Sequence, residues 1–134
     1  MTITEAKVIR LTESEPIQFA ENSVYQPLVN GKAGGYPVFT GIQTAEPGYE
    51  TPPHAHPYPE ILHILEGVAE AWLVGEEDAK VQLEAGDTIV LPADKPHIFR
   101  VASDATLRLL GTHISPERIV HFTDGQVSTM GSSK

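Results

Sequence analysis

The sequence predicts an all-β domain built as an antiparallel sandwich or barrel. From residue 36 onward, short apolar runs alternate with turn residues such as Gly, Pro, Asp and Ser. Short strands at this spacing, separated by turn signals, are typical of sandwiches and barrels. The 134 residues fit one domain, and a domain of this size buries most of a core without disulfide or metal staples.

The first 35 residues form an N-terminal arm that we expect to lie peripheral to the functional site. Residues 6–11 are compatible with a short strand, whereas residues 13–23 are polar and fit no single element. The glycine-rich residues 30–35 predict a turn or loop. Such an arm often adds to a sheet edge of its own chain or of a partner chain, and so covers that edge. We therefore divide the chain into an arm at 1–35 and a barrel, with its C-terminal helix and tail, at 36–134.

The barrel strands are expected where apolar and β-branched residues run together. Each run ends at a cluster containing Gly, Pro, Asp or Ser, as strands in small β-domains do. We expect strands at residues 38–45, 61–65, 68–74, 80–83, 88–91, 98–102 and 106–114.

One short helix is predicted after the last of these strands. Ser115 is a good N-cap, Pro116 suits the first helical position, and Glu117 is an early acid that favours the helix dipole. We expect this helix to end near Phe122 and to be followed by a frayed, serine-rich tail at 127–134.

Composition excludes several classes of protein. There is no cysteine, so a metal must be held by nitrogen and oxygen ligands. The net charge of −9 argues against nucleic acid and against an anionic membrane surface as partners. The N-terminus lacks a signal peptide pattern, and no run approaches the roughly 20 apolar residues of a membrane span. We therefore expect a cytoplasmic protein.

The strongest chemical pattern is formed by His54, His56 and Glu60. Side chains alternate faces along an extended chain, so the two histidines point the same way, and Glu60 shares their parity. Imidazole and carboxylate suit a borderline divalent metal, and two histidines plus one carboxylate with open positions suit Fe(II). We take His97, from a second Gly-Pro-His run downstream, as the fourth ligand.

The first of these runs resembles the first cupin motif at every fixed position. Gly48 is followed by five residues and His54-Ala55-His56, then by three residues and Glu60, then by six residues and Gly67. The second run resembles the second cupin motif in its spacing, and the resemblance covers residues 36–115.

The second run also departs from the cupin pattern at two positions. Gly86, Pro92 and His97 keep the family spacing, but Asp94 stands where Gly is usual and Val101 stands where Asn is usual. Aspartate tolerates left-handed backbone better than most residues, so we expect the turn at Asp94 to form.

The resemblance implies a small jelly-roll barrel with one divalent metal ion inside it. The family binds this metal with three histidines and one glutamate, which correspond here to His54, His56, Glu60 and His97. The metal implied is Fe, Mn, Ni, Zn or Co.

A further histidine is expected inside the barrel. Period-two alternation places Leu107, Leu109, Gly111 and His113 on the inner face of one strand, with Arg108 facing solvent. Because its ordinary pKa lies near neutrality, His113 is a candidate proton shuttle. The alternative is that it is a hydrogen-bonded residue of the barrel wall.

Trp72 leads to an expectation about assembly. Its strand places Ala69 and Ala71 on one face, where small residues suit a crowded barrel interior, and Trp72 on the other. A large aromatic side chain facing outward more often marks a subunit interface than a substrate platform. Together with the arm and the frequent dimerisation of the family, this predicts a homodimer.

Three function classes stay open, each with a small molecule as ligand. We favour an oxygenase, typically a dioxygenase, that holds Fe(II) and acts on an oxygenated or aromatic molecule. An isomerase, epimerase or lyase with Mn, Ni, Zn or Co would act on a sugar acid or hydroxy-carbonyl compound, with His113 or Glu50 as proton carrier. The third class is a binding or sensor barrel without turnover.

Overall fold

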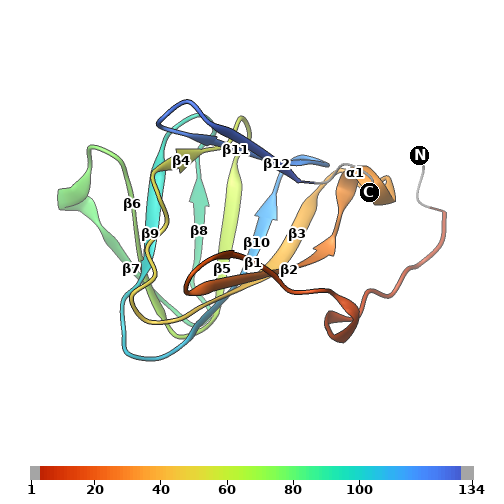
Figure 1. The fold of residues 1–134 in the computed structure, drawn as a ribbon, viewed down its shortest axis with the longest axis horizontal. Helices are drawn as coiled ribbons and strands as arrows, with labels where there is room; N and C mark the ends of the chain where they lie inside the picture. Colours follow the sequence, from red (N-terminus) through yellow and green to blue (C-terminus); the bar gives the residue numbers. More distant parts are fainter. Residues whose placement is uncertain (1–3, 131–134) are drawn as a thin grey trace.

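The fold consists of two antiparallel sheets (Figure 1), seen in a computed structural model that describes residues 4–130. Both sheets combine strands that lie far apart in the sequence, as in a jelly roll. In order across the first sheet, the strands are β1 (Ile17–Ala20), β2 (Ser23–Val29), β3 (Phe39–Ala45), β10 (Leu107–His113), β5 (Glu60–Glu66) and β8 (Thr88–Leu91). Across the second they are β12 (Val127–Met130), β11 (Arg118–Phe122), β4 (His54–Ala55), β9 (His97–Val101), β6 (Val68–Leu73) and β7 (Val81–Glu84).

The core lies between the two sheets and follows the alternation read from the sequence. Leu107 and Leu109 of β10 are buried together with Leu62 and Ile64 of β5, while Arg108 between the first two is only half-buried. The predicted inner face of β10 is therefore confirmed. All seven predicted barrel strands are present, with boundaries that shift by one residue at most.

Helical structure is limited to three short pieces within residues 4–130: η1 (Leu11–Glu13), α1 (Gly31–Gly34) and η2 (Glu77–Ala79). Residues 6–11 form no strand, so that expectation was wrong. Where a loop was predicted, α1 makes a single turn: Asn30 accepts a hydrogen bond from the Ala33 N–H at 3.3 Å, and Gly35 ends it with φ 79°. None of the described helices has the length and apolar character needed to cross a membrane.

The N-terminal arm contributes two strands to its own sheet. β2 pairs with β3 over most of its length, and β1 pairs with β2 and forms the outer edge. Tyr25 of β2 lies directly opposite Gln43 of β3. Residues of the arm are thereby brought within reach of the barrel interior.

The predicted C-terminal helix is wrong, because residues 118–122 form strand β11. Ser115 does accept a hydrogen bond from the Glu117 N–H at 3.1 Å, which is the contact expected of an N-cap. The chain then extends instead of coiling, and β11 pairs with β4 on one side and with β12 on the other. Sheet pairing on both sides, with Val120 buried in the interior, outweighs the local helix signal. Residues 127–130 belong to β12, and residues 131–134 of the expected tail lie outside the described residues.

Trp72 does not present an exposed surface. Ala69 and Ala71 point into the core as predicted, which leaves Trp72 on the outer face of β6. The indole is nevertheless only 7% exposed, because Lys80 lies 4.5 Å from the ring centroid and Arg100 lies 6.0 Å from it. Trp72 therefore gives no argument for a subunit interface.

Candidate metal centre

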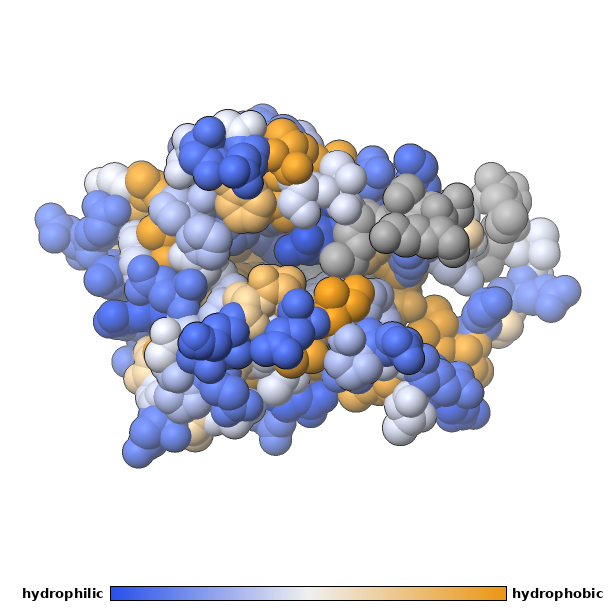
Figure 2. Space-filling view, viewed as in Figure 1, coloured by the Kyte–Doolittle hydropathy of each residue, from blue (hydrophilic) through white to orange (hydrophobic). Residues whose placement is uncertain are grey.

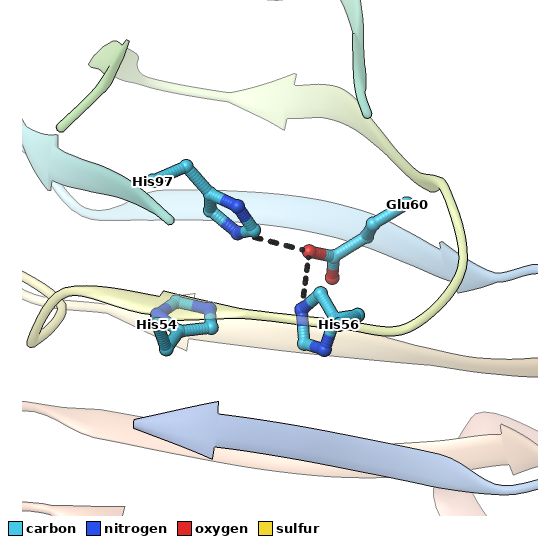
Figure 3. Close-up of side chains that lie close together, drawn as sticks. All are labelled: His54, His56, Glu60 and His97. Atoms are coloured by element: carbon cyan, nitrogen blue, oxygen red, sulfur yellow. Dashed lines mark hydrogen bonds and ion pairs between the residues drawn. The ribbon is translucent and has the colours of Figure 1, made fainter. Parts of the chain in front are cut away.

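Strands of both sheets carry the four predicted ligands to one point (Figure 3). His54 and His97 are register partners on β4 and β9 of the second sheet. His56 lies two residues further along, where the chain leaves β4, and Glu60 begins β5 in the first sheet. The turn between His54 and Glu60 thus spans the gap between the sheets.

The donor atoms of these side chains form a compact group. One nitrogen or oxygen atom from each of the four lies within 4.8 Å of all the others. Glu60 Oε1 is 2.9 Å from His56 Nε2 and 3.4 Å from His97 Nε2. His56, Glu60 and His97 are buried, and His54 is half-buried at the open side of the group.

Backbone carbonyl groups fix the orientation of two of the imidazoles. His54 Nδ1 donates to the Pro52 carbonyl at 2.8 Å, and His56 Nδ1 donates to the Ile119 carbonyl at 2.6 Å. With its Nδ1 protonated, a neutral imidazole keeps the lone pair on Nε2 free. Both Nε2 atoms are thereby prepared as metal ligands, in the arrangement that outer hydrogen bonds commonly give metal-binding histidines.

His97 provides the clearest sign that the group is built for a cation. The residue is 1% exposed, and within residues 4–130 neither ring nitrogen makes a hydrogen bond, although Nε2 has an ion-pair contact with Glu60 at 3.4 Å. Buried polar atoms are nearly always partnered, so an unpartnered imidazole beside a carboxylate requires a further ligand. Three imidazoles and one carboxylate are the donors that borderline divalent metals accept. The residues fit a single divalent metal ion.

Electrostatics keep these ligands in their metal-binding protonation states. Burial alone would raise the pKa of Glu60, but His113, His56 and His97 lower it well below its usual value. Burial also lowers the pKa of His54 to about 4. At neutral pH the carboxylate is therefore ionised and the His54 imidazole is neutral, as metal ligation requires.

Outside the four residues, a hydrogen-bonded chain holds the second oxygen of Glu60. His113 Nε2 lies 3.2 Å from Glu60 Oε2, and His113 Nδ1 lies 2.6 Å from the Tyr58 hydroxyl. A carboxylate only accepts, so Nε2 carries the proton, and Nδ1 accepts from Tyr58. The Tyr58 oxygen itself accepts from the Ile119 N–H at 2.9 Å. His113 is a hydrogen-bonded wall residue here, and its pKa is lowered by burial to about 4.

The structure does not bring Glu50 to the site. Its side chain is exposed, its backbone forms an isolated bridge with Arg100, and it does not contribute to the cavity beside the histidines. A role as proton carrier at this centre has no geometric basis.

A cavity of about 200 Å³ opens beside the cluster. An apolar cavity of about 150 Å³ accommodates benzene, so this one admits a molecule with at least one ring. Figure 2 shows a hollow near the middle of this face of the molecule. Aromatic side chains form much of the cavity wall: Phe19, Tyr25, Tyr49, Phe99 and Phe122.

Several wall residues were not expected from the sequence, and Tyr25 and Arg118 are two of them. Tyr25 comes from the arm that we had placed away from the site, and Arg118 comes from the segment predicted as a helix. The positions of both depend on pairing with β3 or β4, and no signal in the neighbouring sequence indicates that pairing. Of the aromatic residues nearer the motifs, Phe39 is wholly buried and lies outside the cavity.

The two sheets and the buried group of three histidines and one glutamate define a small all-β protein with a candidate metal centre. The family model described as Cupin domain matches residues 41–113, which is more than half of the chain. This chain therefore belongs to the cupin family, and its two sheets are those of a cupin jelly roll.

Three proteins resemble this chain in sequence or in structure. Protein SchB of Streptomyces halstedii is 28% identical over 117 residues, which cover 87% of this chain and 82% of SchB. Polyketide cyclase RemF of Streptomyces resistomycificus has a similar structure, with a TM-score of 0.70 and 21% identity over 81% of this chain and 79% of that one. Oxalate decarboxylase of Bacillus subtilis, a protein with Mn(II) centres, gives a TM-score of 0.73 and 21% identity over 86% of this chain. This chain spans only 31% of the oxalate decarboxylase chain.

Proposed function

We propose that this chain is a metal-dependent enzyme that acts on a small oxygenated aromatic molecule. The observation that carries the proposal is that His54, His56 and Glu60 belong to the wall of the same cavity as five aromatic side chains. In this proposal these three residues and His97 are the ligands of one divalent ion. A ligand in the cavity would have its ring against aromatic walls and its oxygen at the metal centre.

A divalent ion held there would polarise a substrate oxygen or, if it is iron, support chemistry with O2. The chain's own residues would do the remaining work. The aromatic walls orient a ring and exclude water, and His113 holds Glu60 Oε2 so that Oε1 stays turned toward the histidines. This leaves the carboxylate to act as a ligand through one oxygen.

Redox-neutral chemistry, such as enolisation or ring closure, is our first candidate reaction. Two features support it. His113 and Tyr58, two protic groups beside the cluster, sit in defined hydrogen-bonded positions. Polyketide cyclase RemF resembles this chain over most of both lengths. An oxygenase or dioxygenase is the second candidate, favoured by a donor set of histidine and carboxylate without thiolate.

Metal content tests the proposal first. Protein purified without added metal should contain about one divalent ion per chain by elemental analysis. Glu60→Gln and His97→Ala variants should lose it. His121→Gln, which changes an exposed histidine of β11, is the matched control and should keep it.

The reaction class is tested with benzoylacetone, an aromatic β-diketone. Exchange of its central hydrogen for solvent deuterium, measured anaerobically with Mn or Zn, would identify the redox-neutral reaction. O2 consumption only with Fe(II) would identify the oxygenase. A metal-loaded protein that does neither with this probe would contradict an enzyme of either class and would favour a binding barrel.

We also propose that the protein is a homodimer assembled through its arm. Support comes from apolar side chains at the edge of the first sheet, where Ile17 and Phe19 of β1 are 37% and 42% exposed. Light scattering should give twice the mass of the chain at micromolar concentration, and a monomer would contradict the proposal. Phe19→Lys should shift the equilibrium toward monomer.

A further inference from the structure

Arg118 is the cationic side chain in the wall of the cavity, and it forms no ion pair with an acidic residue of the described part of the chain. The wall includes one carboxylate, Glu60, whose oxygen atoms lie within 3.4 Å of nitrogen atoms of three imidazoles. Within residues 4–130, the ion pairs of lysine and arginine involve Lys32, Arg100 and Arg108, and Arg118 takes part in none. A half-buried cation without a counter-charge is ready to bind an anion.

The guanidinium lies over an aromatic ring at the cavity wall. Its central carbon is 5.7 Å from the centroid of Tyr25, a cation–π distance. Its charge also extends into the interior: burial raises the pKa of Tyr25 and of Tyr58 well above the usual value, and Arg118 opposes that rise at both. Arg118 and Tyr25 both belong to the wall of the cavity.

Tyr25 adds a hydrogen-bond donor to the cavity wall. The residue is only 5% exposed, and its hydroxyl oxygen has no hydrogen-bond partner among the described residues. The phenol end of its ring lies close to Gly41, where a Cβ atom would be 2.4 Å from the hydroxyl oxygen. A glycine in the interior of a strand marks such a close approach. The strand provides room for the tyrosine, yet nothing within residues 4–130 satisfies its hydroxyl group.

We propose that Arg118 and Tyr25 form a subsite for the carboxylate of an aromatic acid bound in the cavity. The guanidinium offers the charge and paired N–H donors that suit a carboxylate, and the Tyr25 hydroxyl donates to the same group. The aromatic walls accept the ring. Because the whole protein carries a net charge of −9, anion binding must be local to this cation. The inference deepens the proposed function, since it names the substrate class of the same cavity.

The test uses 2-naphthoate and its neutral analogue 2-naphthamide, with benzoate and benzamide as a smaller pair. Binding is measured by calorimetry in the metal-loaded protein and in metal-free protein, because a carboxylate can also bind a metal directly. Arg118→Gln removes the charge and Tyr25→Phe removes only the hydroxyl group. Arg108→Gln, which removes an equal charge outside the cavity, is the matched control.

We expect Arg118→Gln to weaken carboxylate binding about tenfold or more, and Tyr25→Phe to weaken it about threefold or more, from the usual strength of hydrogen bonds to charged groups. Amide binding should change little in either variant. Arg108→Gln should bind both probes as the wild type does. These differences should persist in metal-free protein.

Several results would overturn the subsite. Equal losses for Arg118→Gln and Arg108→Gln would mean that only net charge matters. Equal losses for acid and amide would mean that the cavity had changed shape. A wild-type protein that binds neither acid would also exclude it.

The metal content of the same samples separates this subsite from the proposed function. If the purified wild type contains no metal and binds naphthoate more tightly than Arg118→Gln does, the subsite is supported and the metal enzyme is refuted. If the protein contains metal and the wild type and Arg118→Gln bind naphthoate equally, the metal enzyme is supported and the subsite is refuted.

Discussion

His113 and Glu60 are register partners on neighbouring strands β10 and β5, and their side chains meet with Nε2 3.2 Å from Oε2. The pairing places a buried imidazole against the oxygen of Glu60 that faces away from the other histidines. The orientation of the carboxylate is therefore set by the sheet, before any metal binds.

His113→Gln should weaken metal binding about tenfold or more, because it loosens the carboxylate that His113 orients. The dissociation constant for Zn or Co can be measured by competition with a coloured chelator. His121→Gln, on the exposed side of β11, should leave it unchanged. An unaltered dissociation constant in His113→Gln would show that the pairing has no effect on the metal centre.

His97→Leu should have opposite effects on stability with and without metal. In metal-free protein the substitution removes two buried nitrogens that have no hydrogen-bond partner among the described residues. The free energy of unfolding, measured in urea with a chelator, should therefore equal that of the wild type or exceed it by about 1 kcal/mol. With metal in 100-fold excess over its dissociation constant, the wild type should gain about 2.7 kcal/mol that the variant does not gain. His56→Leu breaks the bond to the Ile119 carbonyl and should destabilise both forms.

Tyr58→Phe should destabilise the metal-free protein by about 1–3 kcal/mol. The substitution leaves the Ile119 N–H and His113 Nδ1, both now partnered by the hydroxyl group, without that partner. Thermal or urea unfolding measures the loss. Tyr36→Phe is the control, since Tyr36 makes no comparable hydrogen bond within residues 4–130, and its stability should match that of the wild type.

The stability of the metal-free protein should fall as pH decreases from about 6.5 to about 4. Burial lowers the pKa of His54 and of His113 to about 4 in the folded chain, against an ordinary value of 6.5. Between these values the unfolded chain binds protons that the folded chain excludes, so acid favours unfolding. Above pH 6.5 both histidines are neutral in the folded and in the unfolded chain, so they should not make the free energy of unfolding depend on pH. Urea unfolding midpoints measured between pH 4 and 6.5 test this prediction. In the double variant His54→Gln, His113→Gln, stability should depend less on pH.

Gly41→Ala and Gly111→Ala should differ, although the two glycines are register partners on β3 and β10. A Cβ at Gly41 would lie 2.4 Å from the Tyr25 ring, so we expect a loss of about 1–3 kcal/mol from overpacking. A Cβ at Gly111 would have its nearest contact at 3.7 Å, so we expect a change below about 1 kcal/mol. Thermal unfolding compares them directly, and equal losses would show that strand flexibility, not the Tyr25 contact, sets the cost.

Much of the framework could be predicted because it depends on short-range pattern. The alternation of β10 predicted the inward face of His113, and the tolerance of aspartate for left-handed backbone predicted the turn at Asp94, which has φ 65°. Motif spacing singled out His54, His56, Glu60 and His97, which the structure brings together in one buried group.

Other features depended on which strands become neighbours. The segment at 118–122 carries a genuine N-cap contact, yet it extends because β4 and β12 offer backbone partners on both sides. Glu50 belongs to the same run as the histidines but lies on the surface, because parity does not carry through the prolines that separate it from them.

The sequence by itself determined an all-β cupin chain, seven of its strands and the four donors of its candidate metal centre. These follow from periodicity and spacing, which residues express through their nearest neighbours along the chain. Only the tertiary structure decided that Tyr25 and Arg118 share one cavity with those donors, and that Trp72 is covered by its own chain. Such proximity results from pairing between distant strands, for which local residue patterns carry no physical constraint.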